Sequence, residues 1–212
     1  MSAESDPFRD EGDMRELTEA AIARLRADPA AAERMLRQAV DIGSGVLSDR
    51  QLARLASLVV TAVAQQRGRE DDLAAAALAA AHRWMDVSAA DAAHHTVLAA
   101  RVHYRRGRYR SALPLLASAL SAAELPYPPE EIAVLYEQLG HCLQQGRRYR
   151  AAARAYRSGA AVVVGRSQWA ELHGDLVGAA ARAELRARGP VAWVREGAAA
   201  RWQRWTHRAR RR

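Results

Sequence analysis

The sequence predicts an all-α fold in which about ten helices form five antiparallel hairpins of an α-solenoid. Half of the residues are apolar but only 6% are aromatic, so the core must consist mainly of Ala, Leu and Val. No alternating apolar run has the length of a strand, and residues 162–164 are too short for a sheet. Three turn glycines, Gly68, Gly107 and Gly146, recur at intervals of 39 residues. A turn repeated in this way is typical of stacked helical hairpins.

Capping and turn residues predict where the first helices begin. We expect residues 1–12 to be disordered, because they are rich in Ser, Asp, Glu, Pro and Gly, and a first helix to begin near Asp13. Asp28 is a candidate N-cap, and Pro29 suits the first turn of the second helix. Ser48 or Asp49 is expected to cap the third helix. The fourth helix is expected from Leu73 to about Met85, with Asp71 and Asp72 at its positive end.

The remaining helices follow at similar spacing. The fifth helix is expected to start at Ser88 and the sixth to run from Tyr109 to Leu120. The seventh and eighth are expected to lie within Tyr136–Gly159. The ninth is expected to run from Trp169 to about Arg186, and the tenth to pass through Trp193, Trp202 and Trp205. Leu125–Pro129 contains three prolines and is expected to form a stiff linker. We therefore predict a disordered segment at 1–12, a helical repeat domain at 13–206 and a basic tail at 207–212.

One hairpin carries a recognisable motif. Tyr136, Leu139, Gly140 and Leu143 form an aromatic-x2-Leu-Gly-x2-apolar pattern, and an Ala-x3-aromatic pattern at Ala152 and beyond follows the turn. This pattern resembles the tetratricopeptide (TPR) repeat, clearly in residues 133–160 and fairly in 93–120. The repeats are 39–40 residues long, whereas a TPR unit has about 34, so the resemblance is to a divergent, extended TPR of the kind found in bacterial regulators.

Two alignments of the repeats remain open. Tyr109 and Tyr149 are 40 residues apart, and an alignment on these second helices places His103 opposite Leu143. An alignment on the turn glycines has a 39-residue offset and instead places Tyr104 opposite Leu143, in the core.

The resemblance implies a right-handed solenoid whose first helices line a concave groove for a peptide or helix of a partner protein. In the second-helix alignment the groove residues would be Val97, Arg101, Tyr104 and Arg105 from one hairpin and Glu137, His141, Gln144 and Gln145 from the next. Arg101 and Arg105 could bind acidic side chains or a terminal carboxylate, and Tyr104 could be an anchor. The TPR subset that clamps a terminal carboxylate uses Lys and Asn, which this sequence lacks, so that subset is disfavoured.

The charge distribution suggests a second kind of partner. The net charge is +8, and residues 91–212 contain 9 acids and 21 Arg, a balance of +12. All 32 basic residues are Arg, which a GC-rich coding genome explains without selection for Arg chemistry. The C-terminal basic residues and their aromatic neighbours are Arg201, Trp202, Arg204, Trp205, Arg208, Arg210, Arg211 and Arg212. This segment is interpreted as a capping helix with a basic tail, and the alternatives are contact with an anionic membrane or with nucleic acid through Trp stacking.

No catalytic or metal-binding motif is apparent. The seven His are scattered, with no His-Glu-x-x-His pattern and no Gly-rich phosphate loop, and Cys142 is the single cysteine. His95 and His103 could share a helical face and bind a metal, but packed histidines are the favoured interpretation. A stripe of Arg147, Arg150 and further arginines to residue 157 is interpreted as the solvated face of a helix. We expect a non-enzyme without cofactor, acting as an adaptor or as the accessory helper of a neighbouring enzyme.

The ends of the sequence and its hydropathy indicate a location. The first 13 residues are polar and acidic, so no signal peptide is expected, and no run of about 18 apolar residues predicts a membrane span. A cytoplasmic protein is the resulting expectation.

Overall fold

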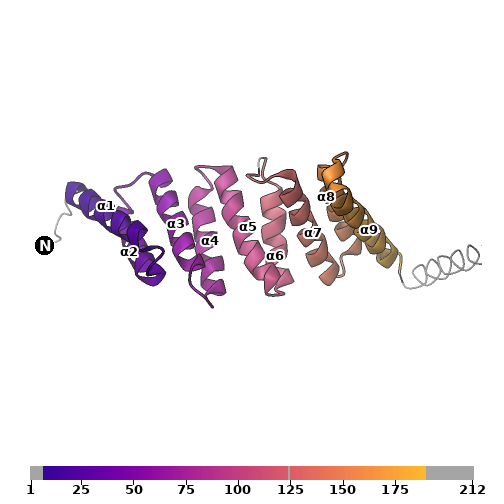
Figure 1. The fold of residues 1–212 in the computed structure, drawn as a ribbon, viewed down its shortest axis with the longest axis horizontal. Coiled ribbons are helices and arrows are strands. Elements are labelled where there is room, and N and C mark those ends of the chain that lie inside the picture. The colour runs from indigo at the N-terminus through magenta and orange to yellow at the C-terminus, as the bar shows by residue number, and fades with distance from the viewer. Residues whose placement is uncertain (1–6, 124, 190–212) are drawn as a thin grey trace, which may run out of the picture. The chain divides into compact units, whose positions relative to one another are not determined.

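The computed structural model describes residues 7–123 and 125–189, and the regular structure in these ranges is entirely helical (Figure 1). The elements are α1 (Pro7–Arg24), α2 (Pro29–Gly43), α3 (Asp49–Ala64), α4 (Glu70–Trp84), α5 (Ala89–Arg105), α6 (Tyr109–Leu120), α7 (Pro129–Gln145), α8 (Tyr149–Val163), the 3-10 turn η1 (Ser167–Trp169) and α9 (Ala170–Ala187). The predicted all-α fold of helical hairpins is confirmed. The expected tenth helix lies outside the described residues.

The chain consists of two compact units. The N-terminal unit, Met1–Pro126, contains α1 to α6, and the C-terminal unit, Tyr127–Arg212, contains α7 to α9. Within each unit every helix packs against the next one along the chain. The division falls in the proline-containing segment that was expected to be a stiff linker.

Most helix starts follow the predicted caps. The Asp28 carboxylate accepts a hydrogen bond from the Ala31 amide over 2.9 Å, and Ser48 forms a reciprocal capping box with Gln51. The Ser88 hydroxyl caps α5 by accepting a hydrogen bond from the Asp91 amide over 3.3 Å. The expected start of the first helix was wrong, because α1 begins at Pro7 rather than near Asp13. Proline suits the first turn of a helix, where its missing N–H has no intrahelical partner in any case.

The turns between paired helices settle the alignment of the repeats. Gly107 adopts a left-handed conformation with φ of +70°, and its amide donates to the Tyr104 carbonyl. In the next hairpin the left-handed residue is Arg147, with φ of +57°, and its amide donates to the Gln144 carbonyl. Gly146, which was expected to be the equivalent turn glycine, has an ordinary φ of −82°. The offset between these hairpins is therefore 40 residues, as in the second-helix alignment.

Small residues allow the helices of the C-terminal unit to approach closely. A Cβ atom built on Gly140 of α7 would lie 2.6 Å from the Tyr156 ring of α8. A Cβ atom on Gly159 would lie 3.0 Å from Tyr136 and 3.1 Å from the Ala133 carbonyl. The Leu-Gly and aromatic positions of the repeat motif are thus explained by the packing of α7 against α8.

A buried polar contact connects three helices of the N-terminal unit. Trp84 Nε1 of α4 donates a hydrogen bond to Ser57 Oγ of α3 over 2.8 Å, and Ser57 Oγ lies 2.8 Å from His95 Nε2 of α5. The Ser57 hydroxyl donates its own proton to the Ala53 carbonyl over 3.1 Å, so Ser57 Oγ acts as the acceptor toward His95. The donor in this contact is then Nε2–H of the corresponding neutral His95 tautomer. Burial lowers the pKa of His95 to about 4, and His95 is therefore neutral at physiological pH. His95 is a packed histidine, as the sequence favoured.

Candidate partner-binding site

Arginines in the hairpin turns bind acids on the preceding hairpin. Arg69, between α3 and α4, forms an ion pair with Glu33 of α2, and Gln66 Nε2 donates to the same carboxylate over 2.8 Å. The Glu33 side chain is only 7% exposed. Burial raises the pKa of Glu33, but the hydrogen bonds from Gln66, Arg69 and Arg37 outweigh it and hold this pKa below its ordinary value. Glu33 is therefore an ionised carboxylate whose hydrogen bonds join two hairpins.

The next turn repeats this arrangement closer to the surface. Arg106 lies 3.3 Å from Glu70, and Arg108 makes a two-nitrogen contact with Asp71. The hydrogen bond from Arg108 holds the pKa of Asp71 below its ordinary value. These carboxylates are more than half exposed, so each pair contributes little to stability by itself. Their main effect is to neutralise the arginines that take part.

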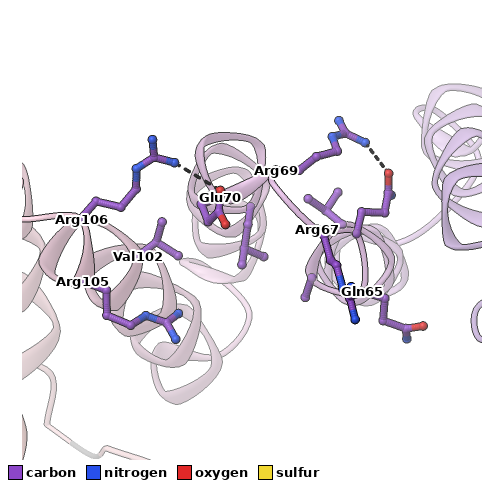
Figure 2. Close-up of a pocket in the computed structure, with 11 residues that line it drawn as sticks. Gln65, Arg67, Arg69, Glu70, Val102, Arg105 and Arg106 are labelled. Atoms are coloured by element: carbon purple, nitrogen blue, oxygen red, sulfur yellow. Dashed lines mark hydrogen bonds and ion pairs between the residues drawn. The ribbon is translucent and has the colours of Figure 1, made fainter.

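The turn pocket lies beside these ion pairs, between the end of α3, the start of α4 and the end of α5, and has a volume of about 600 Å³. Its buried floor includes Val63 and Val102, and Leu73 is half-buried beside them. Figure 2 shows Arg67 and Arg105 on opposite sides of the pocket, with Glu70 between them. Within the described residues, Arg67 and Arg105 are exposed and form no ion pair, whereas Glu70 is already bound to Arg106. The pocket thus combines two available guanidinium groups with an apolar floor.

The four predicted groove residues of α5 differ in how deeply they are buried. Val97 was assigned to the groove wrongly, because it is fully buried on the same helical face as Ala93 and Ala100. Arg101 and Tyr104 are half-buried, and the Tyr104 ring packs edge-on against Tyr109 with centroids 5.6 Å apart. Arg105 is exposed and lines the turn pocket.

The other four predicted residues belong to α7 of the C-terminal unit. Glu137 and Gln145 are exposed, while His141 and Gln144 are half-buried. The Gln145 amide lies 3.0 Å from His141 Nε2, so these two side chains are neighbours on one face. The structure therefore gathers each predicted set within its own unit, and groove binding by α7 remains a prediction.

Cys142 is a packing residue. It is 2% exposed, and burial raises the pKa of its thiol to about 11. A thiol with this pKa is almost entirely protonated near neutral pH and is a poor nucleophile.

The sequence interpretation missed Arg67 and Gln65 as pocket residues. The available signal was the turn itself, because Arg67 directly precedes the left-handed Gly68 as Arg106 directly precedes Gly107. Arg67 and Arg106 occupy equivalent turn positions at the mouth of the pocket, and in the part of the chain that the structure describes only Arg106 of the two has an ion-pair partner.

Several other predictions concern groups of residues. The Arg/Trp-rich segment 201–212 lies outside the described residues, so its roles with membrane or nucleic acid remain predictions. In the described ranges no cluster of three or more His, Cys, Asp and Glu could hold a metal ion. No helix in that part of the chain has both the length and the hydropathy needed to cross a membrane.

Comparison with known proteins defines the class of fold. No family model matches the chain, and no curated protein sequence matches it either. Among solved structures, the chain is similar to TPR-like repeats from Podosopora anserina that are described as those of a kinesin light chain, with 13% identity and a TM-score of 0.50. The match covers 88% of this chain and 100% of that chain. The fold is therefore a TPR-like helical repeat, as the sequence predicted.

Proposed function

We propose that this chain is a non-catalytic adaptor that binds an acidic segment of a partner protein at the turn pocket. The observation that carries this proposal is the pair of exposed guanidinium groups, Arg67 and Arg105, beside the apolar floor of the pocket. A TPR-like fold supports the proposal, because helical repeats present extended surfaces on which peptides and helices bind.

The chemistry of the pocket indicates what the partner segment contains. A guanidinium group binds a carboxylate through two parallel N–H···O bonds, so one or two Asp or Glu side chains fit Arg67 and Arg105. An apolar side chain beside these acids would cover Leu73, which is half-buried in the unbound protein. We therefore propose a segment in which acidic and apolar residues alternate at short spacing.

Charge reversal at the pocket tests this function. Full-length protein carrying Arg67→Glu and Arg105→Glu should lose a partner that the unchanged protein captures from its own cell extract, with the captured protein identified by mass spectrometry. Because hydrogen bonds to charged groups contribute about 1.5–3 kcal/mol each, binding of the purified partner should weaken at least ~10-fold.

The matched control carries the same change of charge elsewhere. Arg50→Glu with Arg83→Glu alters exposed arginines at the far ends of α3 and α4. This control should retain the partner. If both double variants lose it equally, net charge rather than the turn pocket determines capture, and the proposed site is wrong.

A further inference from the structure

The C-terminal unit contains a second basic hollow that the adaptor function does not use. This arginine pocket lies between the start of α8 and the end of α9 and has a volume of about 490 Å³. It is lined by Arg147, Arg148, Tyr149, Arg150, Ala151, Arg154, Arg186 and Ala187. Five of these residues are arginines and none is an acid. Within the described residues, none of the five has an ion-pair or hydrogen-bond partner for its side chain.

Arg157 belongs to the same arginine stripe but, unlike the arginines of the pocket, has its charge neutralised by an ion pair. Arg157, one turn further along α8, forms an ion pair with Glu184 of α9 at 2.7 Å. Glu184 does not line the arginine pocket, and its carboxylate is already paired with Arg157. The stripe expected to be a solvated helical face therefore has two parts, one paired across helices and one gathered around a hollow.

The two other hairpin turns provide an internal comparison for Arg148. Arg69 and Arg108 occupy the equivalent position before α4 and α6, and they bind Glu33 and Asp71 on the preceding hairpins. Arg148, at the start of α8, has no such partner in the described residues. The positive charge that is balanced in the earlier turns is unbalanced in this one.

Arg147 adds an independent observation, which is a backbone conformation unfavourable for its residue type. At the equivalent positions the earlier turns have Gly68 and Gly107, whereas Arg147 has φ of +57°. A left-handed conformation is unfavourable for residues other than Gly, because it brings Cβ too close to the following carbonyl oxygen. Strain of this kind is concentrated at binding sites, where a side chain is needed in a position that glycine would otherwise occupy.

The start of α8 makes the hollow more favourable for anions. Among the described residues no side chain caps this helix, and its first turn contains no acidic residue. The first backbone N–H groups of an uncapped helix lack intrahelical acceptors, and the helix dipole places partial positive charge at the same end. Backbone and side-chain charge therefore have the same sign at this end of α8.

We infer that the arginine pocket binds an oligophosphate group, meaning two or more linked phosphoryl groups. A phosphoryl group carries about −1.5 to −2 charges and three acceptor oxygens. Two linked groups thus supply roughly three to four negative charges within one hollow, to set against its five arginines. A carboxylate carries a single charge, so a peptide would need to bring about five acidic side chains into the same volume. This inference is independent of the turn pocket, which lies in the other unit.

Titration calorimetry on the full-length protein tests the site, with inorganic tripolyphosphate as the probe. Arg150→Gln with Arg154→Gln removes two pocket charges from exposed positions of α8 and keeps a residue of high helix propensity. This variant should bind tripolyphosphate at least ~10-fold more weakly, because each lost contact is a charge-assisted hydrogen bond. Circular dichroism of the variant should match that of the unchanged protein.

The matched control uses exposed arginines of the same unit that lie outside the arginine pocket. Arg166→Gln with Arg182→Gln removes the same charge and should leave the affinity for tripolyphosphate within ~2-fold of the original. A loss confined to the control variant, or an equal loss in both variants, overturns the inference. So does hexaglutamate binding as tight as that of tripolyphosphate, because the pocket would then recognise charge without phosphate geometry.

A second ligand identifies the source of the phosphoryl groups. A nucleoside triphosphate that binds as tightly as tripolyphosphate indicates that the phosphate chain alone is recognised. Tighter binding of the nucleotide, lost in Arg150→Gln with Arg154→Gln, indicates a nucleotide site. Both results support an oligophosphate site, whereas absence of heat change with either probe at millimolar concentration overturns it.

Discussion

Acidification should destabilise the N-terminal unit through His95, and replacing this residue with Gln should remove much of that sensitivity. His95 is buried next to Ser57, Trp84 and His94, and burial is the main cause of its lowered pKa. The positive charge of His94 lowers this pKa further, and Asp91 raises it in part. Gln retains hydrogen-bonding atoms of similar reach to Ser57 but does not titrate in this pH range.

The magnitude follows from proton linkage. The unfolded chain takes up a proton at His95 near pH 6.5, but the folded chain does so only near pH 4. Between these values the unfolded state binds more protons, so the free energy of unfolding falls as the pH falls. The loss amounts to ~2 kcal/mol at about pH 5 and approaches ~3 kcal/mol below the folded pKa, since one pKa unit corresponds to about 1.4 kcal/mol.

Urea unfolding followed by circular dichroism measures this effect. The unchanged protein and His95→Gln are compared near neutral pH and at about pH 5, and the fall in unfolding free energy should be ~2 kcal/mol smaller in the variant. Other titrating groups are the same in both proteins and cancel in this comparison. Equal losses in the two proteins would refute the reasoning, because His95 would then be able to bind a proton without unfolding.

Two further predictions concern backbone positions. Gly140→Ala should lower the unfolding free energy by ~1–3 kcal/mol, because the new methyl group would lie 2.6 Å from the Tyr156 ring. Gly174→Ala, where nothing lies within 4 Å of the added atom, should instead raise it by ~0.5–1 kcal/mol, and similar responses of both variants in urea unfolding would contradict the close approach of α7 and α8. Arg147→Gly should raise the unfolding free energy by ~1 kcal/mol by relieving the left-handed conformation, and a loss of stability in thermal unfolding would show that Arg147 makes a compensating contact.

Most of the fold was predictable because its signals are local. Asp28, Ser48 and Ser88 cap helices through atoms within three residues of themselves, so sequence alone places these helix starts. The start of α1 was missed because its first residues resemble a disordered segment in composition, and only Pro7 hinted at a helical first turn. The glycine spacing predicted the wrong left-handed residue at one turn, because Arg147 rather than Gly146 adopts that conformation.

The candidate sites were harder to predict because they depend on which charges are already paired. Arg67 and Arg106 look alike in the sequence, and only the position of Glu70 makes one neutral and leaves the other available. Val97 failed as a groove residue for a related reason. Its place on α5 differs from that of Arg101 by about one helical turn, and the depth of burial at each position depends on the packing of neighbouring helices.

The ion pairs in the hairpin turns have a consequence for building longer arrays of this repeat. Hairpin α3–α4 contains both halves of the contact, namely Arg69 for the preceding acid Glu33 and Asp71 for the following arginine Arg108. A tandem duplicate of this hairpin would place the new Arg69 against the original Asp71 and would therefore be compatible with itself. Hairpin α5–α6 provides Arg108 but has no acid in the first turn of α6. Extension by duplication should therefore succeed between α4 and α5 and should fail to form this contact when a hairpin is joined after α6.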